Sequence, residues 1–189
     1  MRLGALSFVL SVASLLNACA QAPVQSQASP PRPLAAPATL QTDRVAQQIV
    51  RGAFGEREMT MNCIVSVRGD LLTVIGLTAL GARVFTIRYD GSQVQVEKEL
   101  PTPPQLTAER LLADIQLAFW PSAALQPVLA QQGWRLTEPF PRTRRLWRGS
   151  ALVGEVHYDD DDPWRGRSWL VNLQHGYTLG IESRAPDAQ

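Results

Sequence analysis

The chain has 189 residues, a formal net charge of +1 at pH 7 and two cysteines, Cys19 and Cys63. A charge this small gives no overall electrostatic field for nucleic acid, so we expect no nucleic-acid partner. Two cysteines cannot build a disulfide framework or a cysteine-based zinc site. The length suits an export signal followed by one domain with its own hydrophobic core.

The N-terminus has the pattern of an export signal. The apolar run Leu3–Leu16 is too short to span a bilayer. The Leu-Asn-Ala-Cys sequence that ends at Cys19 resembles the bacterial lipobox, in which the cysteine sulfur takes the lipid. We therefore predict a lipoprotein signal peptide over residues 1–18 and acylation of Cys19. The alternative is an ordinary secretory signal cut at Ala18 or Ala20, which gives a soluble exported protein.

The destination is inferred from the residue after the cysteine. By resemblance to proteobacterial sorting rules, alanine at this position favours the outer membrane, so we expect a lipid-anchored domain at its periplasmic face. Residues 19–40 are predicted to be the acylated cysteine and a flexible tether, because they are rich in Ala, Gln, Pro and Ser and lack an apolar period. The folded domain is expected over residues 41–184, with a disordered tail over residues 185–189.

An antiparallel β-meander is predicted for residues 45–98. Apolar and polar residues alternate along Met59–Val67 and again along Val84–Tyr89, as they do in strands with one buried face. Asp90-Gly91 is a strong signal for a tight turn before the next short strand. Cys63 shares one face with the apolar residues of its strand, so we interpret it as a buried thiol.

Two helices are predicted in the middle of the chain. Thr107 is a plausible N-cap of the first helix, which carries an apolar stripe and stops at Trp120-Pro121. The second is expected from Ser122 to Gln132, with Gly133 directly after its end.

A second meander is predicted to follow, with five candidate strands: Trp134–Thr137, Thr143–Arg148, Leu152–Tyr158, Ser168–Leu173 and Tyr177–Ser183. The order of meander, helical pair and meander predicts an α+β fold. In it, an antiparallel sheet curls into a half-barrel, and two short helices pack in or over its concave face.

The sequence nominates no catalytic residue, metal-ligand set or cofactor, and we expect no enzyme. The aspartate run 159–162 lacks the spacing of a calcium loop and is interpreted as a solvated hairpin tip, with a weak divalent-ion contact as the alternative. His157 alternates with Glu155 along one strand without an evident nucleophile, which leaves a hydrolase as a minor alternative. The basic run 142–148 is either a charged edge strand or a contact for lipid head groups.

A set of apolar residues on the predicted strands and helices shares the inner side of the curled sheet. Two interpretations stay open, an ordinary filled core or a dry cavity for an acyl chain or polyene. The candidate cavity residues are Met59, Met61, Val65, Val67, Val74, Phe85, Ile87, Phe119, Trp120 and Trp134.

Four segments resemble the DUF3261 family of bacterial lipoproteins: Leu77–Gly81, Phe85–Gly91, Leu111–Pro121 and Gly176–Leu179. Members of that family often lie beside genes for aryl-polyene or related biosynthesis. The domain is also distantly similar to the LolA/LolB lipoprotein carriers, whose incomplete antiparallel barrel has helices as a lid over an apolar cavity. In LolB, an exposed leucine in a strand connection helps to deliver lipid to the membrane. The resemblance assigns that role to Leu80, with Leu77 in the same membrane-contact loop, although Ala79 replaces the proline of the LolB motif.

Together these features predict an outer-membrane lipoprotein that binds a hydrophobic lipid-like ligand, such as an acyl chain, a polyene-lipid or a lipoprotein, in an apolar cavity. It would help to transfer that ligand to the outer membrane, with a periplasmic carrier or transporter as a partner. The alternative is a non-catalytic structural or assembly lipoprotein that binds a protein partner through a sheet edge.

Overall fold

The computed structural model describes residues 31–184. The signal segment, Cys19 and residues 185–189 lie outside this range, so the predictions about them stay predictions. None of the helices within residues 31–184 combines the length and hydrophobicity that crossing a bilayer needs.

The described part of the chain folds into ten strands, two α-helices and one short 3-10 helix. The first half contains η1 (Pro37–Leu40), β1 (Arg44–Phe54), β2 (Arg57–Arg68), β3 (Leu71–Leu77), β4 (Arg83–Tyr89) and β5 (Val94–Lys98). The helices are α1 (Ala108–Phe119) and α2 (Ser122–Ala130). The second half contains β6 (Trp134–Phe140), β7 (Thr143–Arg148), β8 (Ala151–Tyr158), β9 (Gly166–Asn172) and β10 (Tyr177–Arg184).

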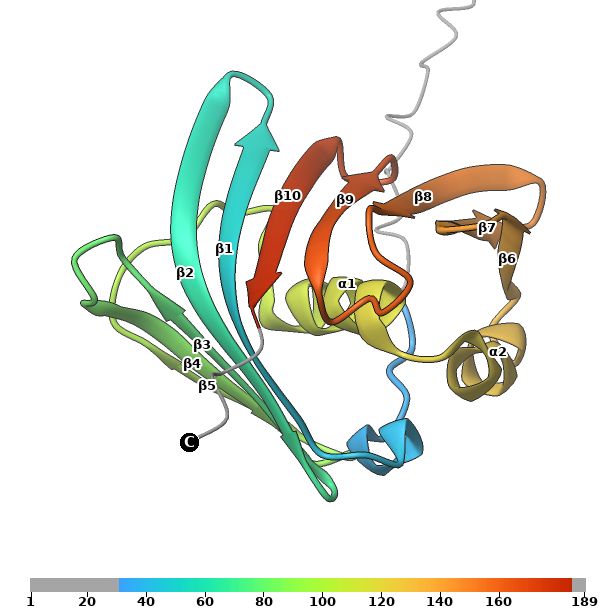
Figure 1. Ribbon diagram of the computed structural model, residues 1–189, viewed down its shortest axis with the longest axis horizontal. Coiled ribbons are helices and arrows are strands. Elements are labelled where there is room, and N and C mark those ends of the chain that lie inside the picture. Colours follow the sequence, from blue (N-terminus) through green and yellow to red (C-terminus); the bar gives the residue numbers. More distant parts are fainter. Residues whose placement is uncertain (1–30, 185–189) are drawn as a thin grey trace, which may run out of the picture. The chain divides into compact units, whose positions relative to one another are not determined.

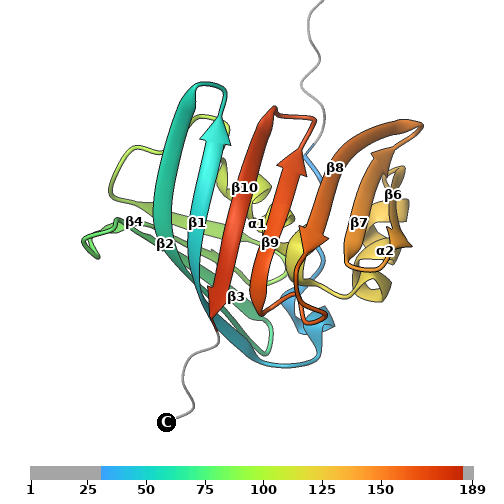
Figure 2. The ribbon, with the colours of Figure 1, turned by 45° about the horizontal axis from the view of Figure 1, so that its top comes forward.

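All ten strands form one antiparallel sheet, in the order β5-β4-β3-β2-β1-β10-β9-β8-β7-β6. The two meanders join where β1 pairs with β10, from Gln47 opposite Arg184 to Phe54 opposite Tyr177. The sheet curls around α1 (Figure 1). When the molecule is turned, α1 lies behind a row of strands in the order β2, β1, β10, β9, β8 and β7 (Figure 2). Because β5 and β6 do not pair with each other, the sheet stays open. The predicted α+β half-barrel is confirmed.

Helix α1 begins and ends where the sequence predicts. The Oγ1 of Thr107 accepts a hydrogen bond from the backbone N–H of Arg110 at 3.3 Å, as an N-cap does. Trp120 already has extended backbone, because the proline that follows it disfavours the helical conformation. Arg144 of β7 closes this end by donating to the carbonyls of Leu117 at 2.7 Å and Trp120 at 2.8 Å.

Residues 31–40 differ from the prediction of a tether that extends to residue 40. The side chain of Gln116 accepts from the N–H of Ala35 at 2.8 Å and donates to its carbonyl at 2.7 Å. The indole of Trp120 donates to Thr39 at 3.2 Å, and Leu40 is buried. Composition misleads here because a proline-rich segment can lie in an extended form against a helix and be held through its main chain. Residues 32–40 are therefore packed against the domain and are not a flexible tether.

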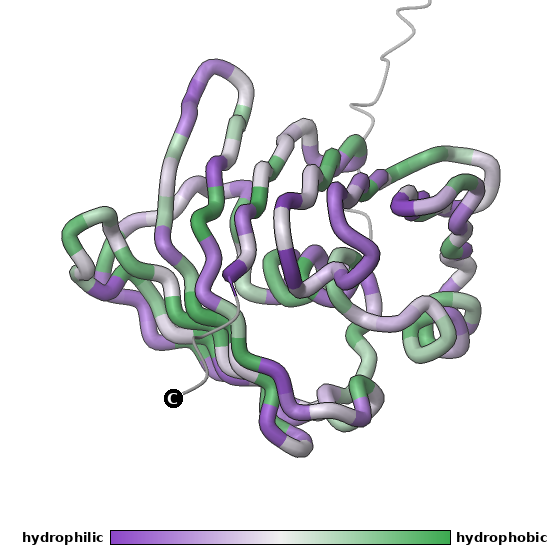
Figure 3. Tube along the Cα trace, in the orientation of Figure 1, coloured by the Kyte–Doolittle hydropathy of each residue, from purple (hydrophilic) through white to green (hydrophobic). Residues whose placement is uncertain are grey.

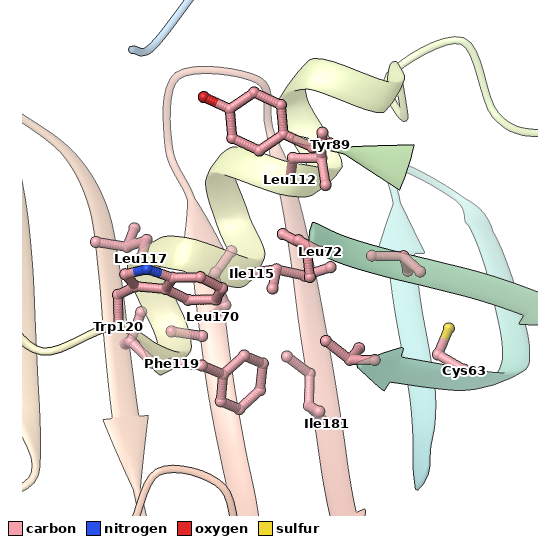
Figure 4. Packing of buried hydrophobic residues seen from close by; sticks show 14 of the residues in the cluster. Cys63, Leu72, Tyr89, Leu112, Ile115, Leu117, Phe119, Trp120, Leu170 and Ile181 are labelled. Carbon is pink, nitrogen blue, oxygen red and sulfur yellow. The ribbon is translucent and has the colours of Figure 1, made fainter. Parts of the chain in front are cut away.

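The hydrophobic core lies between the inner face of the sheet and α1. Leu112, Ile115 and Phe119 of the helix pack among the side chains of the strands (Figure 4). Along the trace, α1 is mostly hydrophobic, and so is the turn between β3 and β4, whereas the turn between β1 and β2 is hydrophilic (Figure 3). A hydrophobic turn at the end of a hairpin is unusual, because turns normally face water.

A candidate ligand-binding cavity beneath helix α1

A cavity of about 60 Å³ lies between α1 and the inner face of the sheet. Two of its lining side chains are polar, and both are paired: Gln48 donates to Ser183, and Asp114 belongs to the ion-paired cluster described below. The surface presented to the cavity is therefore almost entirely hydrocarbon. It is lined by Gln48, Val50, Gly52, Phe54, Met59, Met61, Cys63, Val65, Val74, Phe85, Leu106, Leu111, Asp114, Ile115, Phe119, Leu170, Leu179 and Ile181.

The structure brings six of the ten candidate cavity residues to this space, namely Met59, Met61, Val65, Val74, Phe85 and Phe119. The other four, Val67, Ile87, Trp120 and Trp134, are buried in the core and do not line it. Alternation along a strand finds the inner face, but it does not tell how far along the strand the void extends.

Sequence reasoning missed the contribution of β1, β9 and β10 to the cavity wall. Val50, Leu179 and Ile181 line it because β1 and β10 pair at the centre of the sheet. β1 and β10 are far apart in the sequence, and no local sequence pattern predicts that they pair. Leu111 and Ile115 had a usable signal, since both belong to the apolar stripe of the predicted helix.

Two glycines on the inner face position the aromatic walls of the cavity. A Cβ at Gly76 would lie 2.6 Å from carbons of the Phe85 ring and 2.7 Å from the sulfur of Met61. A Cβ at Gly52 would lie 2.5 Å from the Phe54 ring. The Phe85 ring therefore covers a glycine of the adjacent strand, and the Phe54 ring covers a glycine two positions earlier in its own strand.

A buried charged cluster closes one side of the cavity. The carboxylate of Asp114 on α1 accepts from Arg32, from the hydroxyl of Tyr177 and from the amide of Asn172 at 3.3 Å. The pKa of Tyr177 is raised, first by burial and then by the charge of Asp114. The Arg32 guanidinium and the two hydrogen bonds compensate the buried polar oxygens of Asp114 where they border an apolar space. Asp114 could have been found from the sequence, because it is a charged residue within the apolar stripe of the predicted helix. Our site prediction did not include it.

Cys63 lines the cavity as a buried thiol, which confirms the interpretation from its strand position. Burial raises the pKa of this thiol to about 12. The uncharged thiol is a small hydrophobic group and a poor nucleophile, so it adds to the apolar wall and offers no covalent chemistry.

The predicted membrane-contact loop is an ordered turn with an exposed leucine. The side chain of Leu80 is 97% exposed, whereas Leu77 is half-buried at the end of β3. The turn is held by hydrogen bonds from the N–H of Thr78 to the carbonyl of Ala82 at 2.8 Å and from the N–H of Gly81 to the carbonyl of Thr78 at 2.9 Å. Leu80 is thus presented to solvent by a defined backbone.

The other candidate groups lie away from the cavity and are paired with each other. Glu155 accepts from Arg145 and His157, on the face of β8 opposite to α1. Burial raises the pKa of Glu155, but these hydrogen bonds outweigh it, and the pKa lies below its ordinary value. Arg142 of the basic run pairs with Asp161 of the aspartate run at 2.8 Å. In the described part of the chain, no three His, Cys, Asp or Glu side chains form a set that could hold a metal ion.

The chain is similar to two solved structures at low identity and matches one sequence family over most of its length. A crystal structure of a LolA superfamily protein from Nitrosomonas europaea is 9% identical, with a TM-score of 0.41, and the match covers 83% of this chain and 96% of that chain. A domain described as an outer membrane lipoprotein-sorting protein from Vibrio parahaemolyticus is 10% identical, with a TM-score of 0.42, and the match covers 78% and 86% of the two chains. No curated protein sequence matches the chain. A family model described as a protein of unknown function matches residues 45–185, well over half of the chain, and the protein therefore belongs to the DUF3261 family.

Proposed function

We propose that this protein is a lipoprotein, anchored through Cys19 at the periplasmic face of the outer membrane, that binds a hydrophobic lipid-like ligand beneath α1 and helps to pass it into that membrane. The observation that carries the proposal is the cavity beneath α1 with its apolar lining. Protein interiors are normally filled to the density of organic crystals. At about 24 cal/mol per Å³, a void of about 60 Å³ costs about 1.4 kcal/mol, which a bound hydrocarbon recovers.

The volume of the cavity limits the size of the ligand that it can hold without a change in structure. An apolar cavity that accommodates benzene has a volume of roughly 150 Å³, more than twice the space of about 60 Å³ found here. The narrow end of an alkyl chain therefore fits the cavity better than a ring does. A longer chain requires the side chains of α1 to move away from the sheet or a second space in which the rest of the chain can lie.

Release needs no chemical energy under this proposal. Burial of an alkyl chain in the cavity and in a bilayer removes similar apolar area from water, at about 25 cal/mol per Å² in both places. Transfer from the cavity into the membrane is therefore close to neutral, and the exposed Leu80 gives the domain a hydrophobic contact with the acceptor bilayer.

A cavity-filling substitution tests the proposal. Cys63→Leu adds side-chain atoms at a lining position, and Ser66→Leu adds a similar volume on the opposite face of the same strand. We expect Cys63→Leu to weaken binding of a fluorescent fatty acid at least fivefold and Ser66→Leu to leave the affinity unchanged. Mass spectrometry of the purified wild-type protein is expected to find a bound acyl or polyene molecule.

Two results would contradict a carrier. If the wild-type protein binds no acyl probe and carries no lipid, the cavity is a packing defect. If, in addition, a stoichiometric protein partner co-purifies, the alternative of a structural or assembly lipoprotein is favoured, with the unpaired edge of β5 as its contact.

A further inference from the structure

A groove with about 240 Å³ of open space lies beside the cavity, between β5 and the start of α1. Phe85, Leu106 and Leu111 line both the groove and the cavity. The two spaces therefore adjoin each other and share these three side chains in their walls. The cavity by itself is too small for a long alkyl chain, and the groove supplies adjoining space in which the remainder of the chain can lie.

The barrier between the two spaces can move without breaking the sheet. Leu106 lies in the irregular segment that joins β5 to α1 and has no strand partner. Its backbone N–H donates to the carbonyl of Pro103 at 2.9 Å, within the same segment. Rotation of the Leu106 side chain would connect cavity and groove while every strand-to-strand hydrogen bond stays in place.

The groove also carries two charges. Lys98, the only lysine of the chain, and Glu109 both line it. Both side chains are exposed, and neither has an ion-pair partner within 4.0 Å among residues 31–184. By contrast, the nearby Arg83 and Arg88 are paired with Glu99 and Glu97. A groove with one free cation and one free carboxylate complements a group that carries both charges better than it complements a purely anionic group.

The geometry points to this groove as the mouth of the cavity, occupied by a phospholipid-like molecule with a zwitterionic phosphate–ammonium head group. The alkyl chain lies along Val96 and passes Leu106 into the cavity, Lys98 binds the phosphate, and Glu109 binds the ammonium group. This inference rests on the proposed function, because it names the ligand class of the same cavity.

Binding of three lipids with the same chain tests the inference: lysophosphatidylethanolamine, lysophosphatidylglycerol and the uncharged monoacylglycerol, each displacing a fluorescent fatty acid. We expect the wild-type protein to bind the zwitterionic lipid at least fivefold more tightly than the anionic one. Glu109→Gln is expected to remove this preference by strengthening the anionic lipid, and Lys98→Gln to weaken both phospholipids while leaving the monoacylglycerol unchanged. Val96→Glu is expected to slow the entry of all three lipids.

The matched control is Gln95→Glu, which adds the same charge on the opposite face of β5 and does not line the groove. Equal affinities for the three lipids in the wild type and in every variant, with unchanged rates in Val96→Glu, would overturn the inference and leave the proposed function standing. If the wild-type protein binds none of the lipids or the fatty acid, the proposed function fails and this inference fails with it.

Discussion

At the scale of single residues, the two inner-face glycines decide where the aromatic walls of the cavity lie. Gly76 and Gly52 each lie under a phenylalanine ring, with no room for a methyl group. Gly180 in β10 is different, since a Cβ there would have its nearest neighbour, the carbonyl of Arg51, at 3.9 Å. The three positions look alike in the sequence, as glycines within β-patterns, and only their neighbours distinguish them.

We predict opposite effects of alanine at these positions. Gly76→Ala should displace the Phe85 ring and the Met61 sulfur and destabilise the fold by about 1–3 kcal/mol, the usual cost of overpacking. Gly180→Ala, the control, should be neutral or stabilise by up to about 1 kcal/mol, because it restricts the unfolded chain without a clash. Urea unfolding monitored by tryptophan fluorescence measures both, and equal stabilities would show that the ring does not depend on Gly76.

Residue identity predicted the cavity only in part. Strand alternation correctly placed Met61, Val65 and Phe85 on the inner face. It could not separate them from Val67, which lies on the same face but is covered completely. Whether a buried position borders a void depends on the size and rotamers of side chains from other elements, and these are not encoded within one strand.

At the scale of elements, α1 is held at its C-terminal end and along its length by groups from distant parts of the chain. Arg144 binds its last carbonyls, Asp114 binds Arg32, and Gln116 binds both backbone groups of Ala35. Thr107 and Pro121 made the bounds of the helix predictable, because capping and proline effects are local. The contacts of residues 31–40 were not predictable, since Gln116 and Ala35 are 81 positions apart and a glutamine has no signature for such a partner.

The Gln116 contact can be tested directly. Gln116→Leu keeps a similar size but removes two hydrogen bonds and leaves the N–H and carbonyl of Ala35 unpaired in a buried place. We expect a loss of about 2–6 kcal/mol in the free energy of unfolding, since two buried groups lose their partner and each costs about 1–3 kcal/mol. Hydrogen exchange of the Ala35 amide should also become faster.

The control is Gln132→Leu, at an exposed position after α2. It should change neither the stability nor the exchange of Ala35. If the Ala35 amide stays equally protected in Gln116→Leu, then residues 31–40 are held by apolar contacts such as Leu40, and the glutamine has no anchoring role.

At the scale of the whole folded part, the open sheet separates the two features on which the proposed function depends. The cavity lies between the concave face of the sheet and α1. Leu80 is exposed in the turn between β3 and β4 and does not line that cavity. The overall class of fold was predictable from the order of meander, helices and meander. The joining of β1 to β10 was not, although this pairing makes one continuous sheet out of the two meanders and supplies much of the cavity wall.

Under the proposed function, this separation predicts that delivery can be lost while binding is kept. Leu80→Glu places a charge on a side chain that is 97% exposed and makes no packing contribution, so folding and ligand affinity should equal those of the wild type. Contact with a bilayer should weaken, because the charge must approach the hydrocarbon region. Leu173→Glu, at a leucine that is 52% exposed in the turn before β10, is the matched control.

Transfer of a fluorescent fatty acid from the protein to phospholipid vesicles should be slowed severalfold by Leu80→Glu alone. Equal slowing by both substitutions would indicate a general charge effect, and no slowing by either would remove the β3–β4 turn from the delivery step.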